Sequence, residues 1–336
     1  MARTASVHRR EAVSETQHPS DRPLAGAAFV IAGVGIASTQ DVVLKLMSDG
    51  YPIFQVAVTR SLVSISIICA ILIATRQVGQ FRPNRPVLIA LRGLLTFASY
   101  TCFYLALASV PLADAVSIFF VTPLLVTALS VPLLSERVGM RRWSAVIVGF
   151  LGVLVMVRPG FETMEPALLI ALGGPVGYAF AIILTRRIGM ADSGSTLVLY
   201  NMVTFGLASA AGAALLWVLD LPVSENPSLA FLLRDWGLPS TADLCLMALT
   251  GAVITVAHFC TAQAYRIAPP SFVSGFEYSY FIWAVLLGFF IWGELPDRYT
   301  FIGAAIVMAS GAYVLHRETV VKRAARQASN QSATSS

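Results

Sequence analysis

Ten long apolar stretches constrain the fold of this chain more than any other feature. A helix needs about 20 apolar residues to cross the core of a bilayer, and most of the stretches reach that length. Their residues do not alternate between apolar and polar, as barrel strands would, so helices must satisfy the backbone. Only 12% of the residues are charged, against about 25% in a soluble domain. The sequence therefore predicts an all-α integral membrane protein with ten transmembrane helices, at residues 24–47, 52–74, 87–108, 112–134, 143–157, 166–185, 196–219, 241–265, 271–291 and 299–315.

The chain also contains one pattern twice. At a shift of 158 residues, Gly93 aligns with Gly251 and Glu136 aligns with Glu294, and a Cys, an Ala and a Pro between them match as well. An internal repeat of this kind identifies the architecture. We therefore expect two five-helix halves, flanked by disordered cytoplasmic tails. The predicted boundaries are 1–23 for the first tail, 24–158 and 165–317 for the halves, and 318–336 for the basic second tail.

Lys and Arg are distributed unevenly between the connections. Seventeen of the 23 lie in the tails and in the connections on the side of the termini, and three lie in the connections on the other side. Because positive charge is retained on the cytoplasmic side, both termini are predicted to be cytoplasmic. An odd number of helices in each half then inverts the second half relative to the first, as in many secondary transporters. We expect the protein in the bacterial inner membrane.

Several motifs resemble those of the drug/metabolite transporter superfamily, EamA type. The matching stretches are Pro123 to Ser130, Ser135-Glu136-Arg137, Gly149 to Gly160, Phe276-Glu-Tyr-Ser, and Gly293-Glu-Leu-Pro-Asp297. Three more stretches, beginning at Asp41, Gln55 and Arg92, look like the branch that includes S-adenosylmethionine and riboflavin uptake carriers. The resemblance implies a ten-helix inverted-repeat carrier. It also implies that the first four helices of each half surround a central cavity.

Charged residues inside the predicted spans are candidates for function. Burying one at the bilayer centre costs about 2.5–3.5 kcal/mol on insertion scales. Asp41 and Arg60 lie in the first two spans, at similar depths from the outer ends. In one interpretation they form a buried ion pair that fixes the two helices, with Lys45 as a second partner for Asp41. In the other interpretation both face the cavity and hold a charged group of a substrate.

Glu277 and Arg92 form a second set of candidates. They lie at similar depths from the inner ends of the ninth and third predicted spans, so they are also candidates for pairing. Carboxylates inside transporters often carry protons, which makes Glu277 a candidate coupling residue and protons the candidate coupling ion. The alternative is that Glu277 only reaches the cytoplasmic edge.

Aromatic residues in the spans could line a site for a ring-bearing substrate. The candidates are Tyr100, Tyr104, Tyr178, Tyr278, Tyr280 and Trp283. The alternative is that they belong to the core or to the belt at the membrane interface.

No motif for catalysis or nucleotide binding is present. The chain contains neither GxxxxGK[ST] nor HExxH, and its cysteines lack metal-site spacing. We therefore expect no catalytic residue, cofactor, metal or nucleic-acid partner, and no ATP coupling within this chain. The prediction is a secondary active transporter of a small organic metabolite, such as an amino-acid derivative, a nucleoside-like or a vitamin-like compound. An integral-membrane enzyme and a membrane scaffold stay open as alternatives, and a homodimer as a candidate assembly.

Overall fold

The computed structural model describes residues 23–134, 139–158, 166–188, 192–267, 274–314 and 316, and within these ranges all regular structure is helical. The first half contributes α1 (Pro23–Met47), α2 (Ile53–Ala74), the 3₁₀ helix η1 (Val78–Phe81), α3 (Pro86–Leu107), α4 (Leu112–Phe119), α5 (Thr122–Leu134) and α6 (Met140–Val157). The second half contributes α7 (Pro166–Ile188), α8 (Gly194–Leu219), α9 (Pro227–Leu233), α10 (Thr241–Ile267), the 3₁₀ helix η3 (Ser274–Tyr278), α12 (Ser279–Trp292) and a last helix at residues 298–314.

Seven of the described helical segments are long and apolar enough to cross a membrane. Two further apolar helices, Trp143–Val157 and Phe276–Trp292, are shorter. The fourth predicted span is interrupted, because α4 ends at Phe119 and α5 begins at Thr122. Pro123 explains the break, since it has no backbone N–H to donate to the carbonyl group of Phe119.

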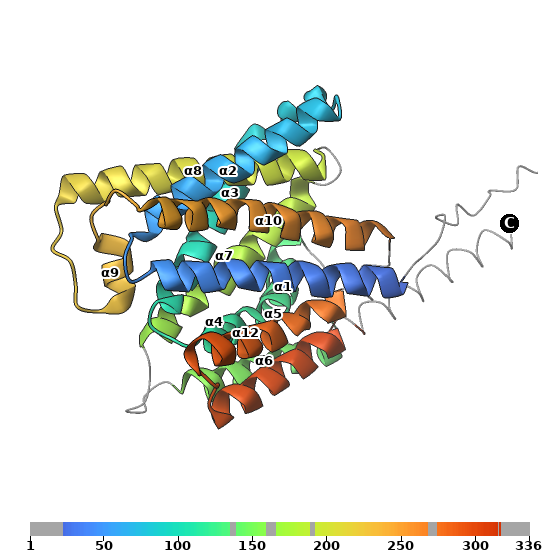
Figure 1. Ribbon diagram of the computed structural model, residues 1–336. Helices are drawn as coiled ribbons and strands as arrows, with labels where there is room; N and C mark the ends of the chain where they lie inside the picture. Colours follow the sequence, from blue (N-terminus) through green and yellow to red (C-terminus); the bar gives the residue numbers. More distant parts are fainter. Residues whose placement is uncertain are drawn as a thin grey trace, which may run out of the picture.

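The helices run between two ends of one bundle (Figure 1). At the terminal end, α1 begins and the helix at 298–314 finishes. At the opposite end, which we call the distal end, lie the connections at 48–52, 108–111, 220–240 and 293–297. The short helix α9 also lies there.

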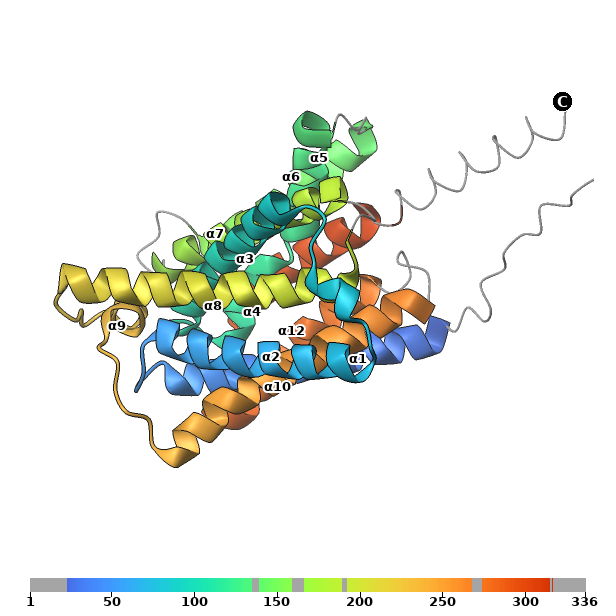
Figure 2. The same ribbon diagram turned by 90° about the horizontal axis from the view of Figure 1, so that it is seen from above.

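The most extensive helix contacts join the two halves of the chain. α1 packs on α10 and α3 packs on α7, while α2 and α8 lie side by side along one edge (Figures 1 and 2). Further contacts join α10 to α2, α3 to α8, α5 to α7, and α12 to both α1 and α4. The main apolar core fills the space between these helices, and its most buried side chains include Val56, Ala106, Leu112, Val116 and Leu124.

Two glycines allow especially close helix contacts. A Cβ atom on Gly93 of α3 would lie 2.7 Å from Cβ of Thr204 on α8. A Cβ atom on Gly251 of α10 would lie 2.9 Å from Cβ of Val63 on α2. Small residues let helix backbones approach closely inside membranes. The two glycines that the sequence repeat aligns therefore serve the same purpose in the two halves.

Candidate functional site

Polar side chains from both halves meet in the interior of the bundle. Asp41 on α1 is only 2% exposed and accepts a hydrogen bond from the hydroxyl group of Tyr280 on α12. Arg60 on α2 is 3% exposed and donates from Nη1 to the hydroxyl group of Tyr104 on α3, at 2.8 Å. Gln40, next to Asp41, donates from Nε2 to the same hydroxyl group at 3.2 Å. We call these five residues the central polar cluster.

Aromatic rings supply the remaining contacts of Arg60. Its guanidinium carbon lies 4.6 Å from the ring centroid of Phe205 on α8 and 5.4 Å from that of Tyr104. A cation held over rings in a desolvated place gains about 2 kcal/mol. The charge of Arg60 is therefore stabilised by neutral groups.

The expected ion pairs of Asp41 are absent among the described residues. The two ion pairs found there are Lys45 with Glu294 and Arg158 with Asp297. Asp41 makes an ion pair with neither Arg60 nor Lys45, although the charge of Arg60 still acts on its carboxyl group. Of the two interpretations left open by the sequence, the direct ion pair is therefore not the one found. The sequence suggested a pair because the two charges lie at similar depths; the structure places the hydroxyl groups of Tyr104 and Tyr280 on them instead.

Two atoms of the central polar cluster have no hydrogen-bond partner among the described residues. They are the donor Nε of Arg60 and the acceptor Oε1 of Gln40, and both are buried. A buried polar atom without a partner costs about 1–3 kcal/mol. Unmet donors and acceptors beside two unpaired charges are what a binding site for a polar ligand requires.

An aromatic wall adjoins the central polar cluster. Tyr100 stacks on Tyr104 at 5.8 Å between ring centroids and meets Tyr178 of α7 edge-on at 6.1 Å. Phe119 of α4 lies 6.5 Å from Tyr178 and 6.3 Å from Tyr100. The structure thus brings Tyr104 and Tyr178 together, as the aromatic-wall hypothesis requires.

Tyr278 and Trp283 make different contacts from the ones predicted. Tyr278 packs edge-on against Phe120, with ring centroids 5.1 Å apart. Trp283 donates from Nε1 to the carbonyl oxygen of Ile31 at 3.2 Å, and so joins α12 to α1. Both contacts are helix packing.

Arg92 and Glu277 lie on α3 and in η3. The bonds described for Arg92 go to neutral groups, from Nε to Thr185 at 2.7 Å and from Nη1 to Asn201 at 3.4 Å. Glu277 belongs to η3, before α12 begins, and its side chain is exposed. It lies at the beginning of the shorter apolar helical segment Phe276–Trp292. It does lie within electrostatic range of Tyr178, which connects it to the aromatic wall.

A second group of charges lies at the distal end. Lys45 donates from Nζ to both carboxylate oxygens of Glu294, each at 2.7 Å, and to the carbonyl oxygen of Val110 at 3.1 Å. Arg158 lies 2.7 Å from Oδ2 of Asp297. Burial opposes the charge of Asp297, but bonds from Thr300 and the charge of Arg158 outweigh it and lower the pKa of this carboxyl group. It is therefore ionised at neutral pH.

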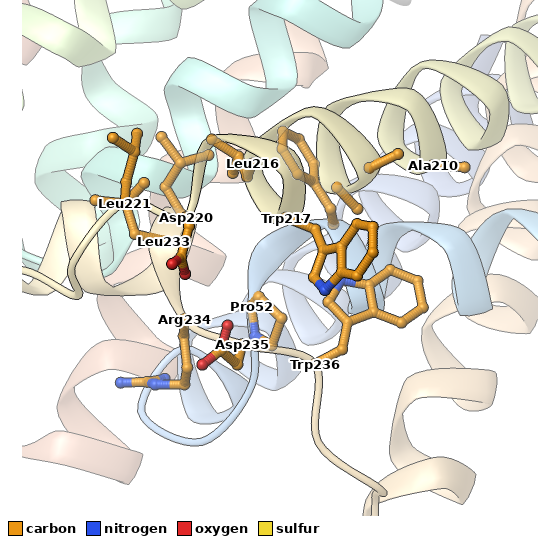
Figure 3. A pocket seen from close by; sticks show the side chains of 14 residues that line it. Pro52, Ala210, Leu216, Trp217, Asp220, Leu221, Leu233, Arg234, Asp235 and Trp236 are labelled. Carbon is orange, nitrogen blue, oxygen red and sulfur yellow. The ribbon is translucent and has the colours of Figure 1, made fainter.

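A pocket of about 720 Å³ opens at the distal end (Figure 3). It lies between the beginning of α2, the end of α8 and the chain that follows α8, and Trp217, Asp220 and Trp236 are among its lining residues. None of the predicted site residues lines it. Arg234, which does, donates to the carbonyl oxygen of Ser48 at 2.7 Å.

Some residues of the central site were missed by sequence reasoning. Gln40 and Phe205 were not candidates, although a Gln within an apolar span is itself a signal. Tyr280 was considered only as a ring, because nothing in the sequence shows that α12 packs beside Asp41. Among the described residues, no group of three or more His, Cys, Asp or Glu side chains could hold a metal ion.

With this geometry in place, comparison with known proteins is informative. Residues 24–158 match the model of the EamA-like transporter family. The resemblance to EamA-type members of the drug/metabolite transporter superfamily is thereby confirmed, and the chain is a multi-pass membrane protein.

Relatives with assigned names extend the similarity over most of the chain. The S-adenosylmethionine uptake transporter of Rickettsia prowazekii is 24% identical, over 88% of this chain and 94% of its own length. The riboflavin transporter of Vibrio cholerae is 28% identical, over 90% and 97%. A pseudopaline exporter of Pseudomonas aeruginosa is 23% identical, over 81% and 89%. All three are named as transporters.

One solved crystal structure has a related fold. It superimposes with a TM-score of 0.55 and covers 85% of this chain and 96% of its own, at 18% identity. Its title names no function, so it speaks for the fold alone.

Proposed function

We propose that this protein is a secondary active transporter that moves a small organic metabolite across the bacterial inner membrane by alternating access. The single observation that carries the proposal is the central polar cluster, in which buried Asp41 and Arg60 make no direct ion pair among the described residues. Charges are expensive inside a membrane. Charged side chains that form no ion pair, at the place where both halves of the chain meet, are best explained by a charged ligand that binds to them.

We propose an inverted repeat as the framework for alternating access. The helix contacts support it, because exchanging the halves turns α1 on α10 into α7 on α3, and α10 on α2 into α3 on α8. Gly93 and Gly251 make matching contacts. In such carriers the halves rock against each other around a site near the midplane. The uneven distribution of Lys and Arg supports cytoplasmic termini, which makes the distal end the periplasmic one.

The site favours a substrate with a ring and charged groups of both signs. Arg60 would hold an anionic group, Asp41 a cationic group, and the rings of Tyr100, Tyr178 and Phe119 a flat ring system. The relatives are named for S-adenosylmethionine and riboflavin, and both molecules contain fused rings. S-adenosylmethionine also carries an amino-acid group with both charges, so it fits the cluster better than riboflavin.

We propose protons as the coupling ion and Glu277 as the residue that exchanges them. The charge of Glu277 acts on Tyr178, which supports this role, because a change of that charge would be felt at the aromatic wall.

Transport in vesicles tests the proposed function directly. Uptake and efflux of radiolabelled S-adenosylmethionine, riboflavin, amino acids and nucleosides would be measured with and without an imposed proton gradient. We expect saturable movement of at least one compound, and loss of that movement in Asp41→Asn. A purified, folded protein that moves none of them in either direction would contradict the proposal for these classes.

A further inference from the structure

We infer that the ion pairs Lys45–Glu294 and Arg158–Asp297 form a gate at the distal end, which must open to admit or release substrate on that side. The inference rests on the proposed function, because a gate has meaning only in a transporter. Both pairs join the first half of the chain to the second, and both lie at the distal end.

The first reason is the position of Lys45 relative to the central polar cluster. Lys45 follows Asp41 by four residues on α1, so the two share one helix face about 6 Å apart along the axis. Lys45 is the residue on the distal side. Its partner Glu294 follows α12, the helix that supplies Tyr280 to Asp41. The Lys45–Glu294 pair therefore lies one helical turn from the cluster, on its distal side.

The second reason is how firmly this pair is held. The side chains of Lys45 and Glu294 are only 12% and 27% exposed. Lys45 also donates to Val110 and lies 4.8 Å from the ring of Trp292. A partly buried, multiply bonded pair holds two segments together much better than an exposed pair does.

The Arg158–Asp297 pair is a second connection between the two halves of the chain. Oδ1 of Asp297 accepts from the backbone N–H of Thr300, at the start of the last helix, while Oδ2 takes Arg158. Arg158 also lies 4.8 Å from the ring of Tyr299. The end of α6 is thereby fixed to the beginning of the last helix.

The third reason is the contrast with the edge formed by α2 and α8. There the halves are joined at both ends of the bundle, by Gln55 to Gly237 at the distal end and by Asn84 to Asp192 at the terminal end. An edge joined at both ends suits a hinge. Opening on the distal side must then part the helices opposite that edge, where Lys45 and Glu294 meet.

A labelling experiment tests the gate without knowledge of the substrate. The four free cysteines (Cys69, Cys102, Cys245 and Cys260) would be replaced, and Ser38→Cys introduced as a reporter. Ser38 is fully buried and lies one turn beyond Asp41, on the side away from the distal end. A membrane-impermeant thiol reagent would be added on the distal side, which is identified by labelling of the exposed position 49 in Asp49→Cys.

We expect Glu294→Gln to raise the labelling rate of Ser38→Cys about fivefold, which corresponds to a shift of about 1 kcal/mol toward the open state. The matched control is Asp49→Asn, which removes one carboxylate at the same end without breaking a described bond. We expect it to leave the rate unchanged. Equal rates in the two variants would overturn the gate.

Cross-linking provides a second test that does not depend on weakening the protein. Cysteines at positions 45 and 294, introduced as Lys45→Cys and Glu294→Cys, would be joined by a short bis-methanethiosulfonate reagent, which forms a disulfide with each thiol, releases methanesulfinate and can be removed by reduction. We expect the cross-link to stop transport and reduction to restore it. Undiminished transport in the cross-linked protein would overturn the gate even though the proposed function stands. Absence of transport in the wild type would contradict the function while the labelling result still reports on the gate.

Discussion

Buried charges are stabilised differently in the central polar cluster and at the distal end. At the distal end, each of Lys45 and Arg158 lies 2.7 Å from a carboxylate of the other half. In the centre, Arg60 and Asp41 are more deeply buried, yet their described partners are hydroxyl groups and rings. In an ion pair each charge compensates the other, and the two groups resist separation. Charges that are met only by neutral groups can still attract an ion.

The difference assigns separate tasks to the two regions. Substrate binding must occur where the protein leaves charge uncompensated, at a cost in stability. Control of access belongs where compensated charges from the two halves meet and can part. Substitutions in the two regions should therefore affect transport differently.

Neutralising the central charges should have the largest effect. We expect Asp41→Asn and Arg60→Gln each to lower transport by about 30-fold or more, since a lost charged contact to substrate costs about 2–5 kcal/mol. Initial rates in vesicles, normalised to the amount of folded protein, provide the measurement. Rates within threefold of the wild type in either variant would remove that residue from the site.

The double variant Asp41→Asn, Arg60→Gln separates substrate contact from mutual pairing. If the two charges only neutralised each other, removing both would restore function. Because they lack a direct bond, we expect the double variant to fold and to stay inactive. Recovery of transport alongside expression would favour the structural interpretation.

Removing part of the aromatic wall should have an intermediate effect. Tyr178→Leu keeps an apolar side chain but loses one ring, and stacking of a ring substrate contributes about 0.5–1.5 kcal/mol. We expect an increase of about tenfold in the apparent KM. Trp283→Leu is the control, because Trp283 packs on α1 instead of on the wall; its KM should not change.

Glu277→Gln should give the smallest effect at a single pH. The substitution preserves size and removes titration, so we expect transport within about threefold of the wild type at the optimum pH. The dependence of transport on pH and on a proton gradient should be lost. An unchanged pH profile would show that Glu277 takes no part in coupling.

The sequence was sufficient for much of the fold, because bilayer thickness dictates helix length. Where the structure describes them, most residues of the predicted ranges are helical, and the interruption of the fourth at Pro123 has a local chemical cause. The partners of charged residues were not predictable in the same way. Lys45 bonds to Glu294, 249 positions further along the chain, and no helix periodicity reports such a contact.

The site could be predicted in composition but not in arrangement. Asp41 and Arg60 stood out because charge inside an apolar span is costly whatever surrounds it. The contacts of Tyr280 and Phe205 with these charges were not predictable, because rings are common in membrane helices. Only tertiary packing brings these two side chains to the charges. For the same reason Tyr278 and Trp283 were grouped with rings that they do not meet.

The most direct test of this account measures binding and transport of one substrate in the same two variants. Equilibrium binding to purified protein and initial transport rates in vesicles would be compared for Asp41→Asn and Glu294→Gln. We predict that Asp41→Asn loses both, whereas Glu294→Gln binds with a Kd within about threefold of the wild type and is impaired only in transport. Equal loss of binding in the two variants would contradict the division between a central binding site and a distal gate.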